Sequence, residues 1–244
     1  MSMPPAGREF PRRSLWVGLL LISPLLGLPG CQTSPPPAPA SSAPAPAARA
    51  ETPAGARQYT VVAEDSLLQI LVYRGGPMAR LGHNHVIASH HLAGEVQLAD
   101  EVTASRFEIR VPVNELTVDE PAMREQAGPD FPANVPQTAR DGTRRNMLSE
   151  ALLDGARYPT LRLRATDVVA AGDGYEVGVE IAIKDQLRQV RVPLRIERKD
   201  GALVARGEFA LKQSDLGLKP FSVAMGTLVV LDEMKIRFEI TARP

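Results

Sequence analysis

Apolar and polar residues alternate along several stretches of this chain, and this period of two restricts the fold more than any other feature of the sequence. In residues 106–113 the apolar side chains fall on one face and most of the charged ones on the other. The same pattern returns in 175–183, 190–196 and 234–240. Successive side chains of a β-strand point to opposite faces, so each stretch predicts a strand with one buried face.

Short polar turns separate these predicted strands. Residues 171–174 read AGDG, 184–186 read KDQ and 198–201 read RKDG. The last two separate neighbouring strands by only a few residues, which implies antiparallel hairpins. Weaker strand patterns occur at 66–73, 160–165 and 203–211. We therefore expect an all-β fold of about eight antiparallel strands, either a closed up-and-down barrel or a sandwich, and closure has the advantage that it removes exposed edges.

Residues 114–158 interrupt the alternation. Within and just beyond this region, residues 143–159 predict a helix, with Thr143 as its N-cap and Gly155 as a stop signal. One apolar stripe of this helix would hold Met147, Leu148, Ala151 and Leu152. A long insertion with its own helix commonly serves as a cover or a functional segment, so we expect a helical lid over one end of the barrel.

The first 31 residues are typical of a bacterial export signal. Basic residues precede the apolar stretch 15–30, which prolines interrupt and which is too short for a membrane span of ~20 apolar residues. It ends in LPGC, and Cys31 is the only cysteine of the chain. This ending resembles the bacterial lipoprotein processing box. The resemblance implies that Cys31 is lipidated, and Gln32 after it implies the outer membrane.

Composition divides the rest of the chain in two. Residues 32–56 are rich in proline and alanine and lack apolar periodicity, so we expect a disordered, semi-extended linker. Residues 57–244 suit one barrel domain. The chain as a whole has a formal net charge of +0 at pH 7. Nucleic-acid binding needs a basic face, so this balance argues against a nucleic-acid partner.

Several ordered segments resemble the YceI-like family of secreted, lipocalin-like barrels. The matching positions are Tyr59, Asp65 and Ser66 near the opening strand, Asn146, Leu148, Leu153, Tyr158 and Pro159 within 146–163, and Ser214, Asp215 and Gly217 within 207–222. The resemblance covers nearly all of 58–241. Two departures stand out. The Thr-Lys-Pro turn common in the family is absent from 184–194, and the GHNH segment is denser in histidine.

The resemblance implies an eight-stranded antiparallel barrel with a helical cover that binds polyisoprenoid lipids such as quinones. We therefore expect a non-catalytic lipoprotein of the bacterial envelope, facing the periplasm and attached through lipidated Cys31. Its partner would be an amphiphilic, isoprenoid-type lipid held in the barrel lumen, and no other cofactor is expected.

All four histidines lie in the short segment 80–92: His83, His85, His90 and His91. Three interpretations stay open. They form a solvated rim of the barrel, or His83 and His85 contact a ligand head group, or His83, His85 and His90 bind a metal. On an extended strand His83 and His85 point to the same side, a spacing that suits metal ligands.

We expect the ligand site to comprise His83, His85, Asn146, Leu148, Leu152 and Phe221, without metal or catalytic residues. The chain has no G-x-S-x-G elbow, and its one cysteine belongs to the processing box. The alternative function is a metal-binding or metal-dependent barrel protein. That alternative needs carboxylate ligands such as Glu95 or Asp215, because no histidine follows His91.

Overall fold

The computed structural model describes Pro53 and residues 55–244. The predicted signal 1–31 with Cys31, and nearly all of the predicted linker 32–56, lie outside the described residues. In the part described, no helix is both long and apolar enough to cross a membrane.

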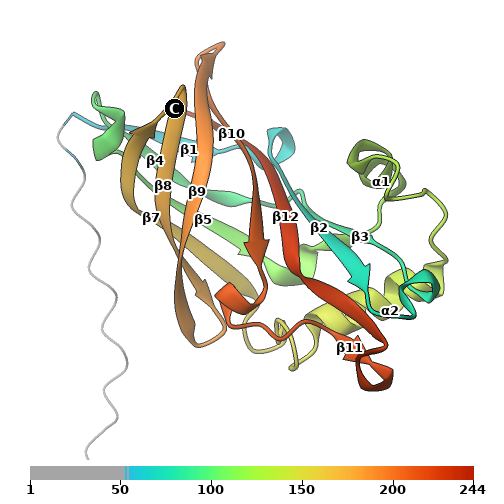
Figure 1. Cartoon of the computed structure of the whole chain (residues 1–244). Helices are drawn as coiled ribbons and strands as arrows, with labels where there is room; N and C mark the ends of the chain where they lie inside the picture. Colours follow the sequence, from blue (N-terminus) through green and yellow to red (C-terminus); the bar gives the residue numbers. More distant parts are fainter. Residues whose placement is uncertain (1–52, 54) are drawn as a thin grey trace, which may run out of the picture. The chain divides into compact units, whose positions relative to one another are not determined.

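Strands dominate the described residues (Figure 1). The strands are β1 (Arg57–Val61), β2 (Leu67–Gly75), β3 (His85–Ser89), β4 (Ala93–Leu98), β5 (Arg106–Pro112), β6 (Thr117–Val118), β7 (Thr160–Ala171), β8 (Gly174–Ile183), β9 (Gln186–Lys199), β10 (Ala202–Lys212), β11 (Ser222–Val223) and β12 (Leu228–Arg243). The α-helices are α1 (Pro121–Ala127) and α2 (Gln137–Leu148).

Eight of the strands close into a ring, with neighbours in the order β1, β4, β5, β7, β8, β9, β10 and β12. Every pairing is antiparallel, and β12 returns to β1, where Val61 pairs with Ala242. The hairpins predicted from the turns at 184–186 and 198–201 are confirmed, and the turn at 171–174 also joins an antiparallel pair, β7 and β8. The chain therefore forms the predicted eight-stranded antiparallel barrel rather than a sandwich.

Six of the strands form three consecutive pairs, and each pair is one long strand interrupted by a bend. The pairs β1 and β2, β3 and β4, and β5 and β6 follow each other along the chain, and each pair is broken by a short bend. Beyond the bends, β2, β3 and β6 continue as an extension of the sheet, in which β2 pairs with β12 from Val229 to Glu239. The bends separate the closed barrel from this extension.

At the bend between β1 and β2, the Ser66 side chain bonds backbone groups that no longer pair between strands. Its buried hydroxyl donates to the Val62 carbonyl at 2.7 Å and accepts from the Thr241 amide at 3.0 Å. Buried backbone groups need partners, so this side chain allows β1 and β2 to part while both stay beside β12.

Helices cover both faces of the extension. Val86 and Ala88 of β3 pack with Met123 and Phe131 on the α1 side. The alternate residue Ile87 joins the main core, to which α2 contributes Met147 and against which Leu148 packs. Figure 1 shows α1 and α2 beside β2 and β3. The predicted helical insertion is thus present, with two helices instead of one.

The predicted bounds of the lid helix were wrong. Helix α2 starts after Pro136, so Thr143 lies in its interior rather than at its cap, and it ends at Leu148. Gln137 donates to Asp141 at 2.7 Å in the first turns, a polar stretch with no hydrophobic signal. After Leu148 the chain enters turns in which Asp154 adopts a positive φ of 48°, and Ala151 and Leu152 lie outside the helix.

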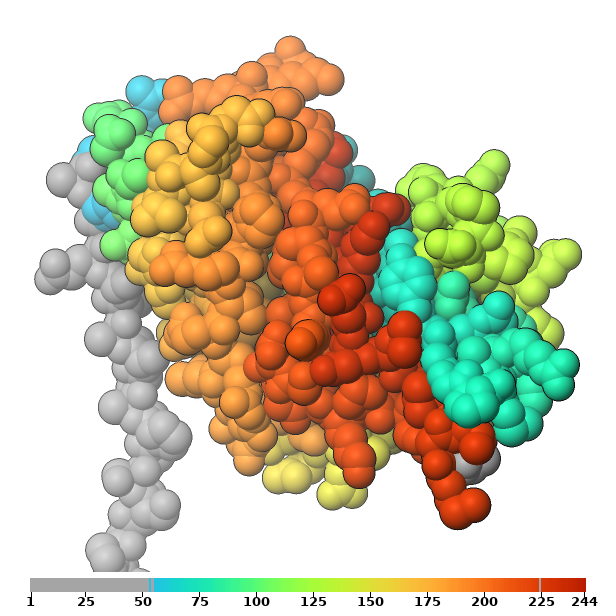
Figure 2. All heavy atoms as spheres, viewed as in Figure 1, coloured from blue at the N-terminus to red at the C-terminus, as the bar shows by residue number. Residues whose placement is uncertain are grey.

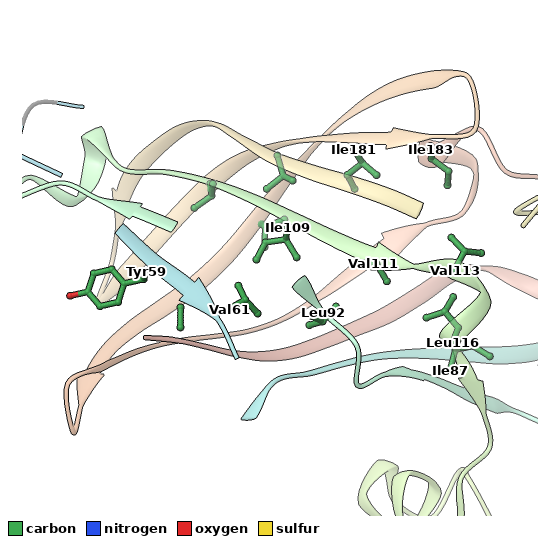
Figure 3. Packing of buried hydrophobic residues seen from close by; sticks show 14 of the residues in the cluster. Tyr59, Val61, Ile87, Leu92, Ile109, Val111, Val113, Leu116, Ile181 and Ile183 are labelled. Carbon is green, nitrogen blue, oxygen red and sulfur yellow. The ribbon is translucent and has the colours of Figure 1, made fainter. Parts of the chain in front are cut away.

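The inward faces of the barrel strands form the main core. Figure 3 shows Ile109, Val111 and Ile181 pointing into the space between the strands. These are residues that the period-two pattern placed on the apolar faces. The alternation therefore predicted correctly which residues of each strand would be buried together.

Gly207 of β10 shows how closely this interior is packed. A Cβ at this position would lie 2.6 Å from ring atoms of Phe238 and 2.5 Å from the Pro193 carbonyl oxygen. We expect Gly207→Ala to lower the free energy of unfolding by about 1–3 kcal/mol through overpacking.

Gly142→Ala is the matched control, because a Cβ there meets nothing closer than 3.9 Å in α2. That change should leave stability equal or higher. Equal loss in both variants, measured by denaturant unfolding, would contradict the packing argument.

Candidate ligand site

The barrel encloses an apolar cavity of ≈ 220 Å³. Its walls come from β2, β4, β5, β7, β8, β9, β10 and β12 together with residues of the connecting segments. Apart from Ser105 and Arg106, the lining residues are aliphatic or aromatic. Such a surface offers a ligand burial and shape but few hydrogen bonds, so the cavity suits a hydrophobic molecule.

Strand β10 contributes the smallest side chain that lines the cavity. Ala205 lines it together with Phe209 and Leu211 of the same strand, whereas Ala210 is exposed on the outer face. The ring of Phe238 covers the position of Gly207, as described above. On the inner face of β10, Ala205 therefore leaves space that a larger residue would fill, whereas the Phe238 ring fills the space above Gly207.

Leu216 lines the cavity from the short helical turn Ser214–Leu216. Ser214 is held there by Asp232, which accepts from its hydroxyl at 2.6 Å and from its backbone amide at 2.8 Å. Gly217 follows with a positive φ of 72° and directs the chain onward. The motif residues Ser214 and Gly217 thus position an apolar wall residue.

His85 lies outside the lining of the cavity, beneath α2. Its Nδ1 lies 2.5 Å from the Asp119 carboxylate and its Nε2 lies 3.2 Å from the Thr143 hydroxyl of α2. The ionised carboxylate accepts from Nδ1–H, so in the neutral ring Nε2 accepts from the hydroxyl. His85 therefore joins the strand extension to the lid helix.

Asp119 lies at the centre of a buried polar network. Neither its side chain nor that of Arg124 is exposed, and Arg124 Nη1 donates to Asp119 Oδ1 at 2.5 Å. The Val86 amide donates to the same oxygen at 2.9 Å. Burial acts to raise the pKa of Asp119, but the hydrogen bonds from His85, Val86 and Arg124 outweigh burial and lower it.

Arg124 fixes the surrounding loops as well. Its Nη1 also donates to the Asn84 carbonyl at 2.7 Å, its Nε donates to the Pro132 carbonyl at 2.8 Å, and its guanidinium lies 5.8 Å from the Phe131 ring centroid. The network thus links β3, α1 and the loop before α2. It forms the polar centre beneath the lid.

Two arginines of α2 complete the attachment of the lid. Arg144 donates to the carbonyls of Leu116 and Asn114, and Arg140 donates to the Asp119 carbonyl at 3.4 Å. Arg144 is therefore half-buried between α2 and the segment after β5. Backbone carbonyls left free by the bend after β5 attract this side chain.

Thr143, His85 and Asp119 have the connectivity of a hydrolase relay. Two features favour a structural interpretation. Arg124 and the Val86 amide already engage the carboxylate, and Thr143 lies in the middle of a regular helix. We interpret the arrangement as a structural contact that holds α2 against the sheet.

The structure brings together only some of the predicted site residues. His83 and His85 are neighbours, with ring centroids 6.0 Å apart. Leu148 and Leu152 pack against the main core, whereas Asn146 is exposed on α2 and Phe221 is exposed before β11. None of the six lines the cavity. A role in ligand binding stays a prediction for each of them.

Sequence reasoning missed most of the cavity wall. The lining residues, such as Leu163, Val179, Val192 and Phe238, belong to the apolar sets that the alternation identified. A barrel has one interior, so closing the predicted strands would have assigned these sets to the lumen. Asp119 and Arg124 lacked any such signal, because the sequence does not show that a loop carboxylate and a helix arginine are buried together.

The other histidines pair with carboxylates near the surface. His90 Nε2 lies 3.1 Å from Glu120, and His91 Nε2 lies 3.7 Å from Glu115. Within residues 55–244 the structure contains no group of three or more histidine, cysteine, aspartate or glutamate residues arranged to hold a metal ion. The metal hypothesis thus has no supporting geometry in this part of the chain.

His83 predicts a pH dependence of stability. Partial burial, followed by the nearby positive charges of His85 and Arg124, lowers its pKa from the ordinary value of 6.5. The unfolded chain then takes up a proton at higher pH than the folded chain, so stability falls as the pH drops below 6.5. His83→Gln should reduce this fall, measured as the change in unfolding midpoint on either side of that pH. An identical fall in both proteins would show that His83 does not contribute.

The chain resembles known proteins in sequence and in fold. The family model described as "YceI-like domain" matches residues 59–242. The crystal structure of Burkholderia cenocepacia BcnA is similar, with a TM-score of 0.55 and 13% identity over 74% of this chain and 98% of that one. For the Campylobacter jejuni YCEI protein the TM-score is 0.40, with 6% identity over 60% of this chain and 80% of that one. A search of curated proteins finds no match.

Proposed function

This chain belongs to the YceI-like family, and from that premise we propose that it is a non-catalytic lipoprotein of the bacterial envelope that holds an amphiphilic, isoprenoid-type lipid in its barrel lumen. The observation that carries the proposal is the cavity, whose lining is almost wholly apolar. A polyprenyl or quinone tail gains ~0.8 kcal/mol per methylene removed from water and needs few polar contacts.

The size of the cavity restricts how such a ligand is held. At ≈ 220 Å³ the cavity is smaller than the roughly 300–1,000 Å³ of pockets that bury a drug-sized ligand. A long tail then requires movement of lining side chains or protrusion of part of the tail from the barrel. We infer that affinity rises with tail length over the first few isoprene units and then levels off.

Extraction of the natural ligand tests the proposal directly. Protein purified from its native membrane would be extracted with organic solvent, and the extract analysed by mass spectrometry. We expect a stoichiometric isoprenoid lipid. Binding of fluorescent polyprenyl alcohols of graded length to the delipidated protein then gives the dependence on tail length. A clean extract together with no binding at any length would reject the lipid function.

The envelope location rests on the sequence before the barrel. We propose that Cys31 is acylated and that residues 32–56 tether the barrel to the outer membrane, with the domain facing the periplasm. Cys31→Ser should abolish incorporation of labelled palmitate and release the protein from the membrane fraction. Retention of label in that variant would contradict lipidation at Cys31.

A further inference from the structure

Two loops meet at the far end of the extension and form what we call the β11 tip, residues 76–83 and 219–228. The Met78 amide donates to the Thr227 carbonyl at 2.8 Å, and Val223 pairs with Leu228. Figure 1 shows the loop around β11 at the lower end of β12, and Figure 2 shows it projecting from the surface below the loop that follows β2. Segments far apart in the sequence thus share one projecting end.

The β11 tip concentrates exposed apolar side chains. Eight large hydrophobic residues are exposed in the described part of the chain, and five of them lie here: Met78, Leu81, Phe221, Val223 and Met225. Leu81 is 61% exposed and Met225 is 104% exposed. Scattered single residues of this kind are ordinary, but a group at a projecting end marks an interaction surface.

Met225 is held outward at a conformational cost. Its φ of 55° and ψ of 37° lie in the left-handed region, which costs a residue other than glycine about 1 kcal/mol. A glycine would adopt this turn without that cost, and a polar residue would suit full exposure better. The position instead presents a long, flexible apolar side chain to the solvent.

The charged residues of the tip itself are all basic. Residues 73–83 contain Arg74 and Arg80, residues 216–231 contain Lys219, and neither segment contains an aspartate or glutamate. Arg74 donates to the Gly82 carbonyl. Within the described residues Arg80 and Lys219 have no ion-pair or hydrogen-bond partner. Exposed apolar side chains beside unpaired cations complement a surface with an apolar interior and anionic groups at its boundary.

We propose that the β11 tip docks on an anionic lipid bilayer, with Leu81 and Met225 inserted among the acyl chains and Arg80 and Lys219 against the phosphates. The geometry matches interfacial binding, in which apolar side chains enter the headgroup boundary while basic residues stay at the surface. Each basic residue near an anionic membrane strengthens binding by about fivefold. The tip would orient the barrel at the membrane independently of any N-terminal anchor.

A site-specific fluorescent label tests this docking. In the full chain with Cys31→Ser, which removes the one native cysteine, Met225→Cys carries a polarity-sensitive dye. The matched control carries the dye on Val169→Cys, an exposed apolar position of β7. We expect vesicles of phosphatidylglycerol and phosphatidylcholine to shift the emission to the blue at 225 and not at 169. Vesicles of phosphatidylcholine alone should act only weakly.

Charge removal tests the cationic part. Arg80→Gln with Lys219→Gln in the labelled protein should weaken the apparent vesicle affinity by about 30-fold. An unaltered unfolding midpoint would verify that the fold is intact. No shift at 225, or an equal shift at 169, overturns the proposal. A shift that depends on protein concentration without vesicles also overturns it, because the tip would then bind a second copy of the chain.

Docking and ligand binding can fail separately. A barrel that binds no lipid in its lumen would still show the vesicle-dependent shift at Met225. A protein that binds polyprenyl alcohols normally but shows no shift would retain the proposed function and lose the docking proposal.

Discussion

Asp119→Ala is expected to destabilise the protein by about 3–5 kcal/mol, since it leaves the fully buried Arg124 guanidinium without its counter-charge. The cost is large because Arg124 Nη2 already lacks a hydrogen-bond partner within the described residues. His85 loses its acceptor in the same variant, so α2 should loosen together with the network. Denaturant unfolding at neutral pH measures the loss, and hydrogen exchange of the α2 amides measures the loosening.

Two further variants test whether the stability lost in Asp119→Ala comes from leaving the buried charge of Arg124 unpaired. Asp119→Leu combined with Arg124→Met removes both charges and should recover much of the lost stability, because a buried ion pair can be replaced by apolar residues at little cost. Asp173→Ala breaks an exposed pair with Arg195 and should change stability little. If Asp119→Ala were as mild as Asp173→Ala, the buried network would not hold the lid.

Ala205→Trp is expected to weaken lipid binding by about two to three orders of magnitude. The indole would fill space that about four or five methylenes of the ligand occupy, at ~0.8 kcal/mol each. Ala205 lines the cavity from β10, so a larger side chain at this position extends into the lumen. Titration with a fluorescent polyprenyl alcohol gives the affinity, and the unfolding midpoint shows whether the barrel stays folded.

Ala210→Trp provides the matched control on the same strand. Ala210 is exposed on the outer face, so the same substitution adds the ring to the surface. Its affinity should equal that of the wild type. Equal loss of binding in both variants, or none in either, would place the ligand outside the lumen.

The sequence predicted the barrel well because strand alternation is a local signal. In 106–113 and 175–183 the period of two separates inner from outer residues without any knowledge of the partner strands. The lid was predicted less well. The start of α2 depends on polar contacts such as Gln137 to Asp141, which carry no hydrophobic pattern.

The candidate site was predicted least well, for a related reason. His83 and His85 attracted attention as a pair, but the partners of His85 are Asp119 and Thr143, 34 and 58 positions away along the chain. His85 meets these two residues only because the bends place the strand extension beneath α2. Neither residue type nor spacing shows that arrangement.

The seam between β1 and β12 has a consequence for the order in which the barrel assembles. Only two positions of β1 pair with β12, whereas ten positions of β10 do. Val61 meets Ala242, so closure joins nearly the first and nearly the last residues of the domain. Contacts of such separation form slowly, since the whole intervening chain must first be brought into place. The lumen therefore cannot be sealed until β12 lies between β10 and β1, so closure is a late event in folding.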